Sequence, residues 1–206
     1  MTSAPYRPTR RTTLSWLAAA MASPLALQDT ASATVGWPAM TLPQITGPGY
    51  GTDPDMAAKK VTWPLTLTAP QRAMVNACAD IILPPAPGQK APSALAIDAF
   101  ADEWLSAPYS RQLADRAAIL PGLAWLDLEA KARFGQPFLA ATDAGRRQIF
   151  DSIAWRDRVT PDLAQAAEFF ARLRGLVILG YYTTPEGEAE LGFAGNSAIA
   201  GVYPGP

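Results

Sequence analysis

The placement of proline is the feature that most constrains how this chain can fold. The 206 residues include 20 prolines and 15 glycines, which are spread along the chain rather than gathered in one low-complexity segment. Five prolines fall between residues 34 and 67: Pro38, Pro43, Pro48, Pro54 and Pro64. Because proline fixes φ and lacks an amide hydrogen, this spacing excludes a long helix or a central strand. The sequence therefore predicts an extended arm over residues 34–67.

Helical periodicity begins where the arm ends. Thr68 and Gln71 have the spacing of a capping box, and Pro70 falls in the first helical turn. Apolar residues then recur at steps of three and four as far as Ile82, which predicts a helix with one apolar face. The Pro84–Pro85 pair is expected to end it.

Further helical segments follow in succession. Ser93 is the expected cap of a helix that ends near Leu105. A segment from Ser110 to Phe134 is expected to be divided or kinked at Pro121–Gly122. Thr142 opens another helix, and the longest one is expected to run from Thr160 to Tyr182. No segment alternates between apolar and polar residues as a strand would.

These patterns predict an all-α fold, an irregular bundle of five to six helices. We expect four segments along the chain. They are an export leader (residues 1–33), the extended arm (34–67), the helical domain (68–182) and an irregular, non-helical tail (183–206).

The first 33 residues have the organisation of a cleavable leader. Arg10 and Arg11 precede an apolar stretch from Leu14 to Leu27, and Ala31 and Ala33 occupy the small-residue positions before a cleavage site. Paired arginines before a mildly apolar stretch are typical of twin-arginine (Tat) leaders. Two chance arginines in an ordinary secretory leader are the alternative. Either leader predicts a periplasmic protein.

The residue types restrict the chemistry that the chain can perform. It has no histidine, which is the most frequent general base and metal ligand. Its one cysteine, Cys78, cannot form an internal disulfide or a multi-thiolate site, and its place on an apolar helix face predicts burial. We therefore predict no catalytic, cofactor-binding or metal-binding residue in this chain.

Carboxylate clusters give little reason to change that prediction. Asp102 and Glu103 are neighbours on one helix, so they point to different sides. Glu186, Glu188 and Glu190 could surround a cation, but a solvated loop is the more frequent arrangement. The formal net charge of −1 gives no indication of a nucleic-acid surface.

Several segments resemble one protein family. They are Ala79–Pro84, Ala94–Phe100, Leu173–Gly175, Gly180–Gly187 and Glu190–Gly195. The Gly-Tyr-Tyr-Thr-Thr-Pro-Glu-Gly segment is the most distinctive. The chain is similar over residues 68–196 to the gluconate 2-dehydrogenase subunit 3 family, the small subunits of membrane-associated flavin dehydrogenases for sugars, polyols and sugar acids.

The resemblance implies a heteromeric periplasmic complex that is peripherally associated with the inner membrane. An FAD-containing catalytic subunit oxidises the substrate, and a multihaem cytochrome c subunit passes on the electrons. The small subunit would be non-catalytic and would carry the flavin subunit through the Tat translocase. The alternatives are a stand-alone periplasmic binding or chaperone-like protein and an enzyme that uses carboxylates alone.

Aromatic residues beside prolines and glycines are the expected contacts with the partner. They are Trp37, Trp63, Tyr181, Tyr182 and Phe193. Packing against the chain's own domain is the alternative for these residues.

Overall fold

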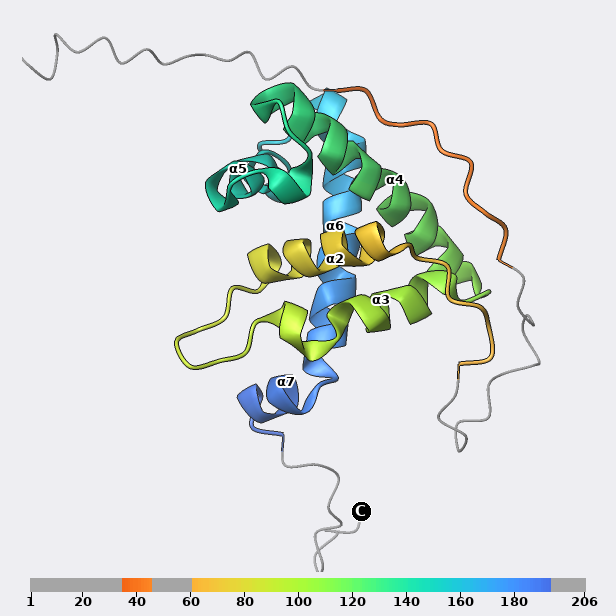
Figure 1. The fold of residues 1–206 in the computed structure, drawn as a ribbon, viewed down its shortest axis with the longest axis vertical. Helices are drawn as coiled ribbons and strands as arrows, with labels where there is room; N and C mark the ends of the chain where they lie inside the picture. The colour runs from red at the N-terminus through yellow and green to blue at the C-terminus, as the bar shows by residue number, and fades with distance from the viewer. Residues whose placement is uncertain (1–34, 46–60, 194–206) are drawn as a thin grey trace, which may run out of the picture. The chain divides into compact units, whose positions relative to one another are not determined.

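The computed structural model of the protein describes residues 35–45 and 61–193, which include six α-helices and three short 3-10 helices and no strand (Figure 1). The predicted all-α fold is thereby confirmed. The α-helices are α2 (Ala69–Ile82), α3 (Ile97–Ser106), α4 (Ser110–Phe134), α5 (Asp143–Ala154), α6 (Ala164–Tyr182) and α7 (Pro185–Glu190). The 3-10 helices are η1 (Pro92–Leu95), η2 (Phe138–Ala140) and η3 (Pro161–Leu163).

Local capping signals set several helix ends as predicted. Thr68 N donates to Gln71 Oε1 at 2.8 Å, and Gln71 N donates to Thr68 Oγ1, which completes the capping box of α2. Thr142 Oγ1 accepts from Gly145 N at 3.1 Å at the start of α5. Gly135 ends α4 with φ 71°, a left-handed conformation that glycine adopts without strain.

The predicted cap at Ser93 is wrong. Ser93 lies inside η1, and its backbone N–H donates to Asp80 Oδ1 of α2 at 2.9 Å. Because this bond ties Ser93 to α2, the chain makes a further turn before α3 begins. Ala96, with φ 56°, is the residue from which α3 starts.

The prolyl-glycyl pair does not divide α4. The helix continues through Pro121, and both Pro121 and Gly122 are buried. A Cβ added at Gly122 would lie 2.0 Å from Cδ2 of Phe169 on α6. The glycine therefore lets α6 pack closely on α4, and this packing stabilises the continuous helix despite the proline.

The expected absence of helix from the tail is wrong for residues 185–190, which form α7. Thr184 Oγ1 accepts from Gly187 N at 3.2 Å, and Pro185 occupies the first turn. A Cβ at Gly187 would lie 2.3 Å from the carbonyl oxygen of Tyr181, so glycine is needed where α7 folds back on the end of α6. Residues 194–206 lie outside the described residues.

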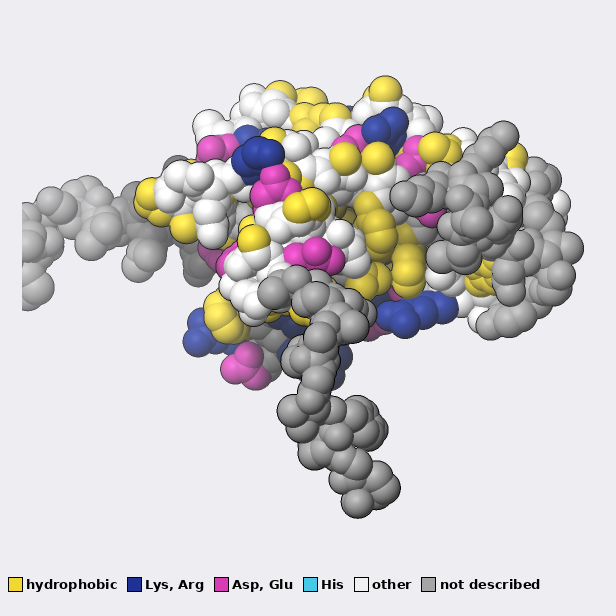
Figure 2. All heavy atoms as spheres, turned by 90° about the horizontal axis from the view of Figure 1, so that it is seen from below, with side chains coloured by type: hydrophobic (Ala, Val, Ile, Leu, Met, Phe, Trp, Pro, Cys, Tyr) yellow, Lys and Arg dark blue, Asp and Glu magenta, His cyan; other side chains and the backbone are white. Residues whose placement is uncertain are grey.

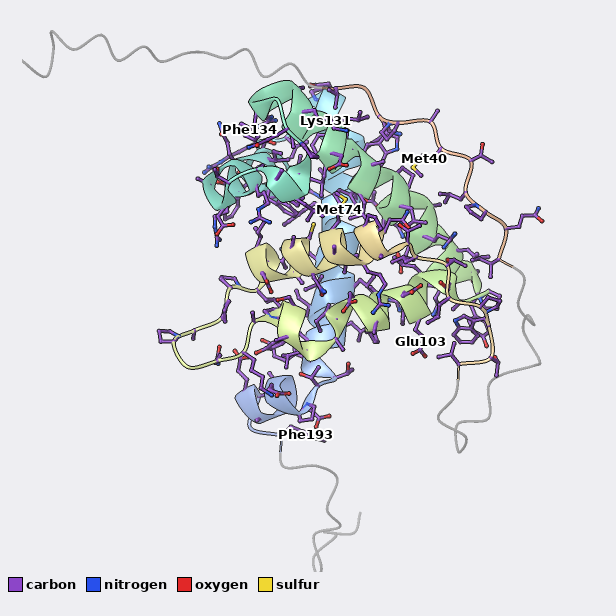
Figure 3. All side chains as sticks on the ribbon, viewed as in Figure 1. Met40, Met74, Glu103, Lys131, Phe134 and Phe193 are labelled. Atoms are coloured by element: carbon purple, nitrogen blue, oxygen red, sulfur yellow. The ribbon has the colours of Figure 1, made fainter. Side chains whose placement is uncertain are left out.

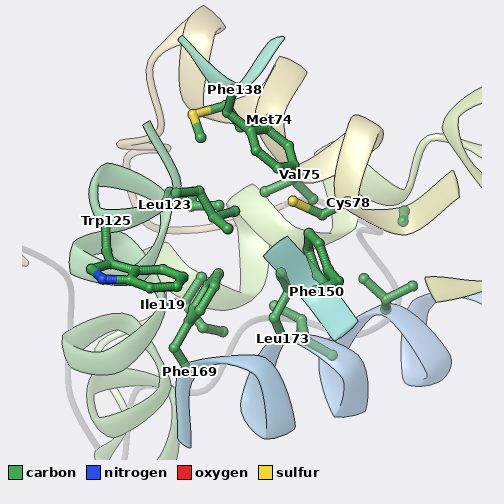
Figure 4. Packing of buried hydrophobic residues seen from close by; sticks show 14 of the residues in the cluster. Met74, Val75, Cys78, Ile119, Leu123, Trp125, Phe138, Phe150, Phe169 and Leu173 are labelled. Carbon is green, nitrogen blue, oxygen red and sulfur yellow. The ribbon is translucent and has the colours of Figure 1, made fainter. Parts of the chain in front are cut away.

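The core forms where α2, α4, α5 and α6 meet. Figure 4 shows Met74, Val75 and Cys78 of α2 facing Phe150 and Leu173. Cys78 is completely buried, as predicted, and this burial raises the pKa of its thiol.

Candidate functional site

The first described segment of the arm is attached to α4 through the backbone of Val35. Figure 1 shows residues 35–45 running alongside α4. Val35 N donates to Glu129 Oε2 at 3.1 Å, and Val35 O accepts from Trp125 Nε1 at 3.3 Å. Both hydrogen bonds join residues about 90 positions apart in the sequence.

Glu129 is a buried carboxylate that receives one of its hydrogen bonds from the arm. Its side chain has no exposed surface, and Oε1 accepts from Arg133 Nε at 2.6 Å. A buried carboxylate needs a counter-charge and hydrogen bonds to both of its oxygens. Arg133 supplies the counter-charge and the donor to Oε1, and the amide of Val35 supplies the donor to Oε2.

Trp37 packs on the chain's own core next to this attachment. Its ring stacks on that of Trp125 with 6.4 Å between the centroids, and it lies 6.5 Å from the ring of Phe169. Trp125 and Phe169 are both buried, whereas Trp37 is half-buried. The structure thus uses one face of Trp37 to hold the arm.

The last residues of the arm are attached to α3 through Asp102. Asp102 Oδ1 accepts from Thr66 N at 3.1 Å, from Leu67 N at 3.0 Å and from the hydroxyl of Ser106 at 3.1 Å. Ser106 Oγ also accepts from Thr66 N at 2.9 Å. Asp102 is 2% exposed, so these donors replace the water that the carboxylate loses on folding.

Arg116 of α4 completes this second attachment. Its Nη1 donates to Thr66 Oγ1 at 2.6 Å and to Leu105 O at 3.0 Å. Burial lowers the pKa of Arg116, and the charge of Asp102 opposes that shift. The buried Asp102, Ser106 and Arg116 all lie at the Thr66 attachment, so this cluster holds the arm against α3 and α4.

Trp63 also contacts its own domain. Its Nε1 donates to Glu103 O at 3.1 Å, and its ring meets that of Tyr109 edge-on at 5.7 Å. Both predicted arm aromatics therefore have an intramolecular role.

The aromatic pair at the end of α6 is divided between the core and the surface. Tyr181 is 7% exposed, and its hydroxyl donates to Glu190 Oε2 at 2.9 Å. This bond to the carboxylate raises the pKa of Tyr181. Tyr182 is half-buried and meets Tyr181 edge-on at 5.1 Å.

Phe193 is the most exposed of the five predicted contact residues. It follows α7, as Figure 3 shows, and is 49% exposed. The nearby Leu191 is 64% exposed. This end of the described chain therefore presents apolar side chains to its surroundings.

A hollow of about 520 Å³ lies between α3, α4 and α6 and was not predicted from the sequence. Trp104, Ile178 and Leu179 contribute apolar surface to it. Figure 2 shows hydrophobic side chains gathered in a hollow with basic side chains nearby. The polar edge is internally paired, since Asp115 accepts from Trp104 Nε1 at 2.9 Å and from Arg172 Nη1 at 2.8 Å.

The acidic residues of α7 do not converge. Glu186 pairs with Lys90 at 2.6 Å, and Glu190 accepts from Tyr181. Within residues 35–45 and 61–193, no group of three potential metal ligands is close enough to hold an ion. No helix in these ranges is long and apolar enough to cross a membrane.

Sequence reasoning missed the residues that attach the arm, because each polar partner lies far from the arm in the chain. A weak signal existed in the i,i+4 spacing of Glu129 with Arg133 and of Asp102 with Ser106. The predicted leader residues Arg10, Arg11, Ala31 and Ala33 lie outside the described residues.

The family model described as gluconate 2-dehydrogenase subunit 3 matches residues 69–205. No curated protein and no solved structure matches the chain.

Proposed function

Because the chain belongs to the gluconate 2-dehydrogenase subunit 3 family, we propose that it is the non-catalytic small subunit of a periplasmic flavin-dependent dehydrogenase. The substrate class is a sugar, a polyol or a sugar acid. The family match over residues 69–205 is the observation that carries this proposal, since it covers every described helix from its first turn onward. Substrate oxidation belongs to the flavin subunit.

The redox groups belong to partner chains in this proposal. FAD lies in the catalytic subunit, and haem c lies in a multihaem cytochrome subunit that links the complex to the inner membrane. The buried carboxylates of the small subunit support this division of labour, because Glu129 and Asp102 are both engaged in holding the arm.

Export is the second part of the proposal. Arg10 and Arg11 direct the folded chain to the Tat translocase, and cleavage follows Ala33. The flavin subunit folds in the cytoplasm, docks on the small subunit and crosses the membrane with it. The small subunit thereby aids the maturation of its partner and stabilises the complex.

Tyr182, at the end of α6, and Phe193, after α7, are proposed contacts with the flavin subunit. The exposed ring of Phe193 and the half-buried ring of Tyr182 support this role, and aromatic side chains next to glycine suit a close interface. The inward faces of Trp37 and Trp63 hold the arm, which leaves their outer edges for the partner. Replacing Tyr182 and Phe193 together with alanine should weaken the complex, and an unchanged complex would remove them from the interface.

The export proposal is tested by changing Arg10 and Arg11 together to lysine. We expect both the small subunit and the flavin subunit to remain in the cytoplasm, with flavin absorbance and dehydrogenase activity lost from the periplasmic fraction. Arg7→Lys is the matched control, because it makes the same chemical change outside the arginine pair. A flavin subunit that still reaches the periplasm would contradict the carrier role.

A separate assay tests the non-catalytic role. The purified mature chain should show neither flavin nor haem absorbance and should not turn over any sugar, polyol or sugar acid. Turnover by the chain alone would instead favour an enzyme that uses its own carboxylates.

A further inference from the structure

Two neighbouring hollows form one groove between α5 and α6. Their volumes are about 350 and 540 Å³, and Ala154, Phe170 and Arg174 line both. The smaller hollow also has Ile81 of α2 and Phe150 of α5 in its wall. This α5–α6 groove is therefore elongated and has apolar walls.

Trp155, at the C-terminal cap of α5, lies at the edge of the groove with 56% of its surface exposed. The guanidinium of Arg158 lies 5.8 Å from the centre of its ring. Tryptophan side chains are buried for the most part, and tryptophan is frequent at the centre of protein interfaces.

The arginines of the described residues fall into three groups according to their contacts. Four pair with carboxylates: Arg72, Arg133, Arg146 and Arg172. Three others are occupied by a tryptophan ring or by hydrogen bonds: Arg111, Arg116 and Arg158. The remaining three, within residues 35–45 and 61–193, have no such partner, and all three line the groove: Arg147, Arg156 and Arg174.

The acidic residues that face the groove do not neutralise it. Glu168 lines the larger hollow but is bonded to Arg172 at 2.7 Å. Asp151 is the other carboxylate in the lining; it shares the smaller hollow with Arg147 and Arg174, while Arg156 lines the larger one. The groove is thus basic on a chain whose formal net charge is −1.

From this arrangement we infer that the α5–α6 groove binds an acidic peptide segment of the flavin subunit, with an apolar side chain of that segment seated beside Trp155 and Phe170. This inference rests on the proposed function for the identity of the partner. Arginine and tryptophan are the residue types that contribute most to interfaces, and guanidinium groups recognise carboxylates with two parallel hydrogen bonds. A second copy of the chain does not fit, because a two-fold contact would place the same basic groove against itself.

The test uses the complete small subunit, expressed together with the flavin subunit that the export experiment identifies. Arg147→Glu, Arg174→Glu and Trp155→Ala are each expected to weaken binding of the flavin subunit by roughly tenfold or more. Arg111→Glu is the matched control, since Arg111 is an exposed arginine outside the groove, and it should change binding by less than about twofold. Binding of the native complex should also weaken as salt is raised.

The possible outcomes separate the two proposals. If the native chain binds no flavin subunit, the proposed function fails and the inference fails with it. If the native chain binds but the groove variants bind equally well, the inference alone is overturned. If the groove variants lose binding to anionic phospholipid vesicles but still bind the flavin subunit, the groove belongs to a membrane surface and the inference is overturned as well. Equal thermal unfolding midpoints for all variants confirm that each one folds.

Discussion

The side of the domain that the arm covers differs from the α5–α6 groove in how its charges are compensated. Beneath the arm, Glu129 and Asp102 are almost completely buried and accept hydrogen bonds from the arm's own backbone. In the groove, Arg147 and Arg174 are exposed and have no partner among the described residues. The chain therefore compensates these two buried carboxylates and leaves open two arginines that water can still solvate.

The buried carboxylates beneath the arm stabilise the fold, whereas the exposed arginines of the groove are available for binding. A buried carboxylate that loses its partners destabilises the folded state, whereas an exposed arginine contributes little to stability. Substitutions beneath the arm should accordingly change the free energy of unfolding, and substitutions in the groove should change association.

The largest effect is expected for Glu129→Ala. The substitution leaves Arg133, whose side chain is 10% exposed, without its counter-charge, and it leaves the amide of Val35 without an acceptor. We expect the free energy of unfolding to fall by about 3–5 kcal/mol, measured by denaturant unfolding of the mature chain.

Glu168→Ala is the matched control for this change. It also removes a glutamate that pairs with an arginine four residues later, Arg172, but at an exposed position. Its cost should be only about 0.3–0.5 kcal/mol. Equal costs for the two variants would show that burial does not distinguish the two regions.

The next effect is expected for Asp102→Ala, which removes the acceptor of Thr66 N and Leu67 N and leaves Arg116 without its neighbouring carboxylate. We expect a loss of roughly 2–3 kcal/mol and faster proteolysis of the arm near residues 61–67. Glu103→Ala alters the adjacent but exposed residue and should stay within about 0.5 kcal/mol of the native chain. An arm that is equally protected in both variants would contradict its attachment through Asp102.

A smaller effect tests the same contrast between buried and open positions without any charge. Gly122→Ala would place a methyl group against the buried ring of Phe169, so we expect a loss of about 1–3 kcal/mol. Gly175→Ala on α6 meets no atom within 4 Å and should gain up to about 1 kcal/mol from helix propensity. Differential scanning calorimetry of the two variants would show opposite shifts in Tm.

The smallest effect concerns the exposed pair of Lys90 and Glu186. The hydrogen bond from Lys90 lowers the pKa of Glu186 below that of an ordinary carboxyl. A lowered pKa in the folded state stabilises it above the ordinary carboxyl pKa, and this contribution is lost as the pH falls through the lowered value. Lys90→Ala should therefore raise the pKa of Glu186 towards its ordinary range in an NMR titration. Lys131→Ala, at a lysine of α4, should leave it unchanged.

Most helix positions could be predicted from the sequence, because capping and proline act over a few residues. Thr68 with Gln71, Thr142 and Gly135 each mark a helix end that the structure confirms. Thr184 and Pro185 carry the same kind of capping signal at the start of α7. The prediction of a non-helical tail missed it because the segment is short and rich in glycine. At Pro121–Gly122 the local signal predicts an interruption of α4, but the close contact of Gly122 with Phe169 of α6 stabilises the continuous helix.

The candidate site was less predictable. The aromatic residues suggested an outward role, yet the rings of Trp37 and Trp125 stack on each other, although they are far apart in the sequence. The groove arginines were not singled out from the sequence. Glu168, four residues before Arg172, marks Arg172 as a paired arginine, but nothing local shows that Arg174 lines a groove. Only the positions of α5 and α6 reveal that Arg147, Arg156 and Arg174 lie together.

The sequence by itself determined the helical class, the positions of most helices and the family, because these depend on residue types and short-range spacing. The tertiary structure decided where the arm attaches, which aromatic rings are buried and which arginines remain unpaired. The physical reason is distance along the chain. A cap acts between residues three or four positions apart, whereas the bond from Val35 to Glu129 exists only after packing has brought together residues 94 positions apart.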